Sequence, residues 1–185
     1  MDRRYHPHIF ICLTFLLAAA LKGLYAASST EHLLLILSPT SLLVSSSLGL
    51  SAEYTHAGYS IAPLHVLIDK SCAGINFLVI LFTALATTAP YRYLSLWRSA
   101  WLFTGLVILS LILTPLVNTS RILGAIALLK FKTTIPFLAS AWMHEAEGAF
   151  IYLTALTITY LAIRKFYLTI ENHAQYPTSR LAVHH

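Results

Sequence analysis

Charge is scarce in this sequence. Of its 185 residues only 10% are charged, whereas 57% are hydrophobic and the mean hydropathy is +0.72. A soluble domain has about 25% charged residues, and a globule of this size has too much surface to hide so many apolar side chains. The composition excludes a soluble globule, a disordered chain and a coiled coil. It predicts an all-α polytopic integral membrane protein with a single membrane-embedded domain, residues 1–185.

Cysteine is also scarce, since the chain has only Cys12 and Cys72. Two cysteines form neither a disulfide framework nor a CxxC metal motif. A zinc-binding HExxH motif would need a histidine where Gly148 stands. We therefore expect no metal and no other cofactor. The basic residues form short clusters between apolar runs and no stripe with aromatic residues, so we expect the lipid bilayer as a partner and no nucleic acid.

Long apolar runs dominate the sequence. A helix needs about 20 apolar residues to cross a bilayer. Four segments predict full spans, at about residues 8–27, 72–89, 96–117 and 148–163. Large residues at Leu24 and Tyr25 favour an uncleaved anchor over a cleaved signal peptide for the first of these. Residues 171–185 form a polar tail that we expect in the cytoplasm.

Two further apolar segments are interrupted. Ser38 and Pro39 break residues 33–50 and predict a helix restart, so we expect two short helices that leave and return on one side. Lys130, Lys132 and Pro136 break residues 122–141, which predicts a re-entrant hairpin that brings both lysines to the inner interface. Between these segments, residues 51–71 predict a small extracytoplasmic loop or β-hairpin, although Pro63 argues against a central strand.

The Lys and Arg residues predict the orientation of the spans, because they concentrate in cytoplasmic loops. Nine of the twelve then lie on the cytoplasmic side: Arg3, Arg4, Arg92, Arg98, Lys130, Lys132, Arg164, Lys165 and Arg180. The outer loops hold most of the acidic residues. This orientation places Cys72, Arg121 and His144 at the outer face, each at a helix end.

These three residues fit the chemistry of a thiol nucleophile. A thiolate needs a base, and histidine is the usual one, so His144 would take the proton of Cys72. Arg121 would stabilise the oxyanion that forms when the sulfur attacks a peptide carbonyl, or would orient the substrate. His56 and His65 are weaker alternatives for the base. Glu145 or Glu147 would orient His144, or both are solvated loop charges.

Each residue also has a simpler interpretation. Cys72 alone is more simply an apolar cysteine at a helix start, and Arg121 alone is equally an interfacial anchor. The combination at one membrane face favours the chemical interpretation. A runner-up from another class is a non-enzymatic membrane assembly or transporter subunit with a polar path lined by Arg121 and His144.

Three motifs in order resemble the exosortase/archaeosortase family of membrane cysteine transpeptidases. They are Cys72-Ala73-Gly74, Asn118-Thr119-Ser120-Arg121 and His144-Glu145-Ala146-Glu147-Gly148. Residues 36–40 and 58–61 are also similar to the family's segment before the cysteine, so the resemblance covers about residues 32–165. The short chain and the motif Cys-Ala-Gly-Ile-Asn most resemble the exosortase K subgroup.

The resemblance implies a function and a site. Family members act in the bacterial inner membrane on secreted proteins whose C-terminal sorting signal has a short motif, a transmembrane helix and a basic cluster. Cys72, Arg121 and His144 match the catalytic triad. Asn76 and Asn118 match motif positions too, where their side chains would hydrogen-bond the substrate or a helix. The expected activity is cleavage near the motif and transfer to an acceptor, at the extracytoplasmic face. A family member that has lost its activity is a third interpretation.

Overall fold

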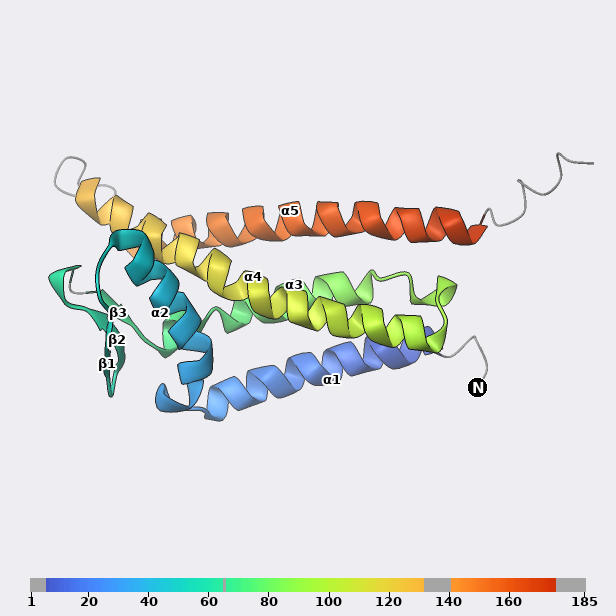
Figure 1. The fold of residues 1–185 in the computed structure, drawn as a ribbon, viewed down its shortest axis with the longest axis horizontal. Coiled ribbons are helices and arrows are strands. Elements are labelled where there is room, and N and C mark those ends of the chain that lie inside the picture. The colour runs from blue at the N-terminus through green and yellow to red at the C-terminus, as the bar shows by residue number, and fades with distance from the viewer. Residues whose placement is uncertain (1–5, 65, 132–140, 176–185) are drawn as a thin grey trace, which may run out of the picture.

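Five α-helices make up most of the computed structural model, which describes residues 6–64, 66–131 and 141–175. They are α1 (His6–Ala27), α2 (Leu34–Leu48), α3 (Ile75–Thr87), α4 (Leu96–Phe131) and α5 (Ala141–Gln175). Four of them run along the long axis of the molecule, and α2 lies across one end (Figure 1). Five helical stretches of the described chain are long and apolar enough to cross a membrane. The predicted polytopic all-α membrane protein is therefore confirmed.

A small antiparallel sheet lies at the same end as α2 (Figure 1). Its strands are β1 (Glu53–Thr55), β2 (Gly58–Ile61) and β3 (Val66–Ile68), in the order β1-β2-β3. The predicted hairpin is thus present and is extended by a third strand. Pro63 lies in the 3-10 turn η2 (Ala62–Leu64) between two strands, which agrees with its inability to donate in a ladder.

Short 3-10 turns make the remaining connections. Turn η1 (Glu31–Leu33) leads into α2, and η4 (Tyr91–Tyr93) connects α3 to α4. Turn η3 (Lys70–Ala73) follows the sheet and contains Cys72. The chain passes from β3 to α3 through this turn, so the cysteine lies where the sheet meets the helices.

The predicted restart at Pro39 is wrong, because α2 is one helix with this proline inside it. Its buried residues are Leu37, Thr40, Ser41 and Val44. This helical spacing continues across the proline, so packing of one face keeps the helix together despite the lost hydrogen bond. As expected, α2 begins and ends at the same end of the molecule (Figure 1).

The predicted re-entrant hairpin after Arg121 is also wrong. Helix α4 continues for 36 residues, through Pro115 and Arg121 to Phe131. At 1.5 Å per residue it is about 54 Å long, which exceeds a hydrocarbon core of about 30 Å. Lys130 therefore lies in the last turn of α4, at the same end of the molecule as Arg121. The chain does not return to the opposite interface between these two residues. Lys132 and Pro136 lie outside the described residues.

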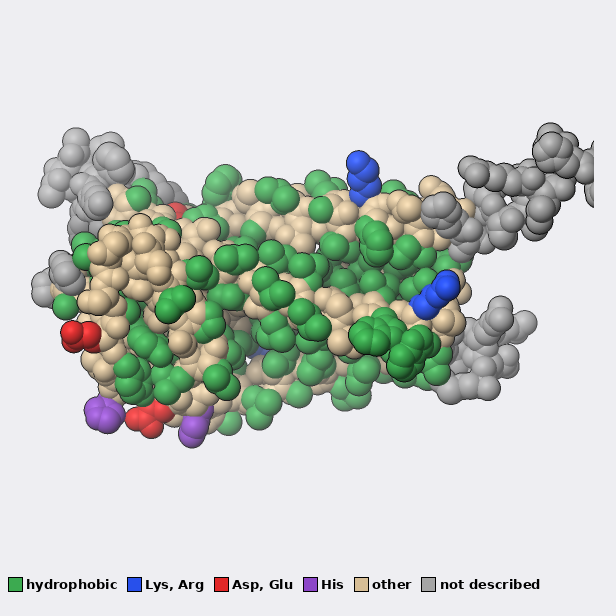
Figure 2. All heavy atoms as spheres, in the orientation of Figure 1, with side chains coloured by type: hydrophobic (Ala, Val, Ile, Leu, Met, Phe, Trp, Pro, Cys, Tyr) green, Lys and Arg blue, Asp and Glu red, His purple; other side chains and the backbone are tan. Residues whose placement is uncertain are grey.

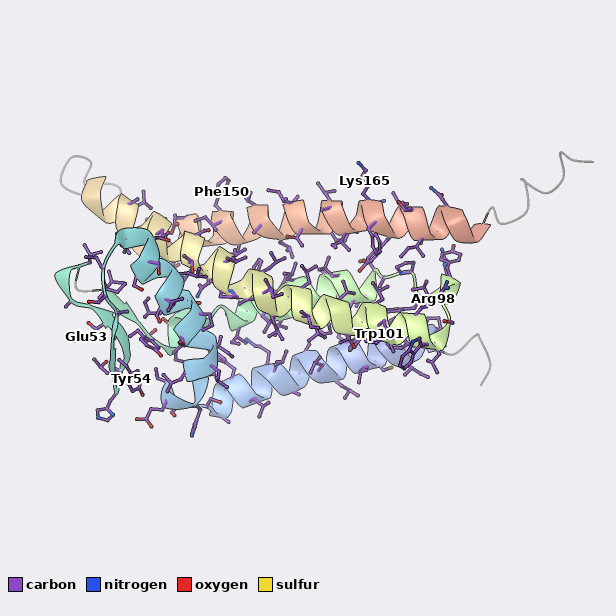
Figure 3. The ribbon with its side chains drawn as sticks, in the orientation of Figure 1. Glu53, Tyr54, Arg98, Trp101, Phe150 and Lys165 are labelled. Atoms are coloured by element: carbon purple, nitrogen blue, oxygen red, sulfur yellow. The ribbon has the colours of Figure 1, made fainter. Side chains whose placement is uncertain are left out.

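The two ends of the molecule differ in charge. Acidic and histidine side chains gather at the sheet end of the visible face, lysine and arginine lie toward the other end, and apolar side chains cover the middle (Figure 2). Glu53 marks the sheet end, and Arg98 and Trp101 mark the other (Figure 3). Trp97 and Trp101 are 71% and 62% exposed, which is typical of an interfacial aromatic belt.

Two apolar clusters hold the helices together. One joins α1, α3, α4 and α5 around Phe82, Leu85 and Phe103. The other joins α2, the sheet, α3 and α4 around Leu37 and Ile68. It includes Ala73, beside Cys72, and Ile122, beside Arg121. The second cluster therefore fixes both candidate residues to one packed unit.

Candidate functional site

Local hydrogen bonds shape the turn that carries Cys72. The side chain of Asp69 caps η3 by accepting from the backbone N–H of Ser71 at 2.9 Å and from its hydroxyl at 2.6 Å. The backbone N–H of Cys72 donates to the carbonyl of Asp69 at 2.9 Å. Gly74 then adopts a left-handed φ of +68°, which ends the turn and lets α3 begin at once. The half-buried Cys72 thus stands directly before a helix.

Helix α4 holds this turn from the side. The side-chain amide of Asn118 donates to the backbone carbonyl of Cys72. Asn118 is fully buried, and its amide oxygen accepts a hydrogen bond of 2.8 Å from the Tyr152 hydroxyl. A Cβ at Gly74 would lie 3.0 Å from Cγ2 of Thr114, so the turn approaches α4 at a distance only glycine allows.

Arg121 and Cys72 line the same pocket. Arg121 lies three residues after Asn118, on a neighbouring position of the same helix face. The pocket has a volume of about 190 Å³. Its other walls are apolar and come from β3 and α4: Val66, Leu67, Ile122, Ala125 and Ile126. A thiol and a guanidinium from distant parts of the chain therefore face one small, largely apolar space.

Helix α5 supports Arg121 from its other side. A Cβ at Gly148 would lie 3.2 Å from Cδ of Arg121, so the arginine side chain passes over this glycine. The guanidinium carbon lies 5.7 Å from the centre of the Tyr152 ring, a cation–π contact. The Nε atom of Arg121 is buried and has no hydrogen-bond partner among the described residues.

A second charged side chain crosses between α4 and α5. The carboxylate of Glu147 is buried and lies over Gly124 of α4. It contributes, with Arg121 and Cys72, to the electrostatic field at the Tyr152 hydroxyl. The neighbouring Glu145 is exposed. Of the two glutamates that the sequence could not separate, only Glu147 therefore belongs to this cluster.

His144 lies in the first turn of α5, but its side chain is outside the described part of the structure. Its backbone is one turn before Gly148, the glycine that contacts Arg121. The structure therefore places Cys72 and Arg121 on one pocket. It also packs α5, the helix that carries His144, against Arg121. The role of His144 as the base stays a prediction.

The other predicted residues lie as follows. Asn76 is exposed, and its side-chain oxygen accepts a hydrogen bond of 2.7 Å from Lys22 of α1, away from the pocket. His56 is exposed and lies 3.4 Å from Glu31. His65 falls outside the described residues. Among the residues that are described, no three His, Cys, Asp or Glu side chains gather as a metal site.

Tyr152 is the residue that sequence reasoning missed. It contacts Asn118 through its hydroxyl and Arg121 through its ring. A signal for it was present, because His144, Gly148 and Tyr152 recur every four residues and so share a face of one helix. A hydroxyl at that spacing inside an apolar span indicates a polar contact within the protein.

Comparison with known proteins agrees with this arrangement. The family model described as Transmembrane exosortase (Exosortase_EpsH) matches residues 2–161. No curated protein and no solved structure shows a significant match to the chain. This match does not identify a subgroup, so the likeness to exosortase K stays a prediction. Because the match covers most of the sequence, this multi-pass membrane protein belongs to the transmembrane exosortase family.

Proposed function

We propose that this protein is a membrane-embedded cysteine transpeptidase that processes C-terminal sorting tails of exported proteins at the extracytoplasmic face of the inner membrane. One observation carries the proposal. Cys72 and Arg121 line one pocket, and Arg121 also contacts Gly148, one helical turn from His144. Family membership supports the same reaction class.

The proposed reaction has two steps. His144 takes the thiol proton, and the sulfur of Cys72 adds to the peptide carbonyl, forming an oxyanion that the Arg121 guanidinium binds. The C–N bond then breaks, the amine of the tail leaves with the proton from His144, and a thioester remains on Cys72. An acceptor amine, or water, attacks the thioester and restores the thiol. One donor of this kind typically lowers the barrier by ~3–4 kcal/mol.

The walls of the pocket suit this chemistry. They are mainly aliphatic, so they would receive an uncharged substrate side chain beside the scissile bond. An apolar surrounding also strengthens the attraction between the guanidinium and a developing negative charge. The substrate would be a secreted protein whose tail has a short motif, a transmembrane helix and a basic cluster.

The middle of the bundle does not favour the transporter alternative. A polar path needs side chains that are open to water or cargo near the membrane midplane. The buried hydroxyls of Ser110 and Thr114 in α4 instead donate to carbonyls of their own helix, Leu106 and Ser110, at 2.8 Å and 2.7 Å. The polar groups of the site lie at one end.

Tail processing in cells tests the proposal. A tagged secreted protein with a C-terminal sorting tail from the same genome is co-expressed with each variant, and loss of the tail is followed by mass. We expect Cys72→Ala, Arg121→Ala and His144→Ala each to abolish processing. Cys12→Ala is the matched control and should process normally, because Cys12 lies on the exposed surface of α1. Full processing by all three site variants would end the enzyme proposal.

A further inference from the structure

We propose that Tyr152 is a positioning residue that holds both the nucleophile and the arginine of this site. The inference rests on the proposed function only in treating Cys72 as the reacting group. Tyr152 is not among the residues that line the pocket, and its contacts in the site are with Asn118 and Arg121, so it would act through these two residues. Its hydroxyl and its ring have separate partners, which allows the two effects to be tested apart.

The hydroxyl of Tyr152 holds the second end of the Asn118 amide. A side-chain amide has a donor end and an acceptor end that can exchange places by rotation. The backbone carbonyl of Cys72 only accepts, so the amide nitrogen of Asn118 must face it. The Tyr152 hydroxyl donates to the amide oxygen at 2.8 Å and so holds the side chain at its other end. Without that hydroxyl, the fully buried Asn118 loses the partner of its oxygen.

The ring of Tyr152 packs between two helices. Its centre lies 5.1 Å from the ring centre of the buried Phe77 in α3 and 5.7 Å from the guanidinium carbon of Arg121 in α4. Phe77 lies in the first turn of α3, directly after the turn that carries Cys72, so the same ring contacts the helix that follows the nucleophile and the arginine. Tyr152 therefore joins the three elements that form the site.

Tyr152 also sets the register of α5. Much of this helix is exposed, and residues such as Phe150 point away from the bundle (Figure 3). The backbone of His144 lies two turns before Tyr152, about 12 Å along the helix. A helix fixed at Tyr152 carries residue 144 in a fixed register toward Arg121. The loss of its contacts would loosen all three candidate residues together.

Tyr167 offers a matched control. It lies on the same helix, is buried, and its hydroxyl donates to the backbone carbonyl of Leu85 at 3.0 Å. Tyr167→Phe thus removes a hydrogen bond of the same kind at the other end of the α3–α5 contact. Any effect that comes only from weaker helix packing should be equal in Tyr152→Phe and Tyr167→Phe.

The first measurement is independent of enzyme activity. In a Cys12→Ser background Cys72 is the single thiol, and its alkylation by a bulky maleimide is timed at fixed pH. Neither tyrosine substitution changes the charged residues next to Cys72 in the turn, Asp69 and Lys70, or Arg121 across the pocket. We expect Tyr152→Phe to release the turn and to speed alkylation about two- to tenfold, the factor that one buried hydrogen bond represents. Tyr167→Phe should alkylate like the parent.

Coupling to Asn118 identifies the route. If Tyr152 acts on the turn through Asn118, Tyr152→Phe should add nothing to the alkylation rate in an Asn118→Ala background. Tail processing should meanwhile show a lower kcat with an unchanged KM, although the thiol is more accessible. Tyr152→Leu, which also removes the ring beside Arg121, should lower kcat further.

The outcomes separate this inference from the proposed function. One outcome is that neither the parent protein nor any variant processes tails, while Tyr152→Phe still speeds alkylation of Cys72. The positioning role then stands and the transpeptidase proposal fails. If Tyr152→Phe alkylates like the parent, or if Tyr167→Phe changes as much, the positioning role is overturned. Equal further effects of Tyr152→Phe with and without Asn118 would also overturn it.

Discussion

Two glycines, Gly124 and Gly148, lie under the two charged side chains that cross between α4 and α5. A charged group within or near a bilayer is costly unless it is enclosed by protein. A side chain at either glycine would occupy the space of the Glu147 carboxylate or of the Arg121 stem. The small residues therefore let the helices approach while they enclose Arg121 and Glu147.

The space at Gly148 leads to a specific prediction. Gly148→Ala places a methyl group 3.2 Å from Cδ of Arg121, so the arginine must move by a few tenths of an ångström. Small displacements of a catalytic group lower rates steeply, and we expect tail processing to slow by about tenfold or more. Initial rates in membranes measure this effect.

Gly105→Ala is the control for that substitution. Gly105 lies within α4, and a Cβ there would meet nothing within 4 Å. Alanine also has the higher helix propensity, so this variant should fold and process tails normally. Equal losses for Gly105→Ala and Gly148→Ala would show that the arginine is not displaced as argued.

At the scale of elements, the turn η3 is held by its neighbours on several sides. Lys70 donates to the backbone carbonyls of Ala26 and Ser28 at the end of α1, at 3.3 Å and 2.6 Å. The hydroxyl of Tyr25 donates to the carbonyl of Lys70 at 3.1 Å. Asn118 of α4 donates to the carbonyl of Cys72 in the same turn. Hydrogen bonds from α1 and α4 therefore both fix the segment that carries the thiol.

Two glycines with nearly the same backbone conformation test the contact of this turn with α4. Gly74 and Gly49 have φ of +68° and +66°, so alanine at either costs roughly 1–2 kcal/mol for the left-handed backbone. Only Gly74 faces close neighbours, Thr114 and Asn118. We expect Gly74→Ala to lose a further ~1–3 kcal/mol from overpacking. Thermal unfolding in detergent measures the difference, and equal shifts would contradict the close contact.

Proline explains where helix prediction from the sequence failed. A proline inside an apolar run signals a break, yet α2 continues through Pro39 and α4 through Pro115. The face of α2 packs against α4 and the sheet, and this tertiary packing outweighs one missing hydrogen bond. The error at Lys130 has a similar origin, because charge bias is a tendency over many loops and does not fix the position of a single lysine.

At the scale of the whole molecule, the separation of charge between the two ends is the feature that the sequence predicted best. Arg98 lies toward one end and Glu53 lies at the other, the end of the sheet (Figure 3), and acidic and histidine side chains gather at the sheet end of the visible face (Figure 2). Alternating apolar spans and basic clusters suffice to derive this arrangement. The same reasoning brought Cys72 and Arg121 to one end before any geometry was known.

Labelling of intact cells tests the orientation in the membrane. Glu53→Cys and Arg98→Cys are made in a chain that lacks Cys12 and Cys72, and both positions are exposed. A membrane-impermeant maleimide should label Glu53→Cys in intact cells, because we expect the sheet end outside. Arg98→Cys should react only after the membrane is made permeable. The reverse pattern would place the site on the cytoplasmic side.

The contacts within the site could not be predicted in the same way. The sequence placed Asn118 at a motif position, but its bond to the Cys72 carbonyl depends on how α4 packs against η3. Tyr152 belongs to an apolar span and gains its meaning only from Asn118 and Arg121. Residue identity indicates which groups can react, whereas helix packing decides which groups hold them.

The hydrogen bond from Asn118 has a practical consequence, because its acceptor is the main-chain carbonyl of Cys72 and not the sulfur. Substitution of Cys72 by serine leaves this hydrogen bond to the main chain in place. A variant without the thiol should therefore keep the shape of the surface that binds the substrate. Cys72→Ser should bind tail-bearing substrates without cleaving them, for long enough to allow chemical crosslinking in living cells. If the proposed function is right, mass spectrometry of the crosslinked proteins should identify its natural substrates.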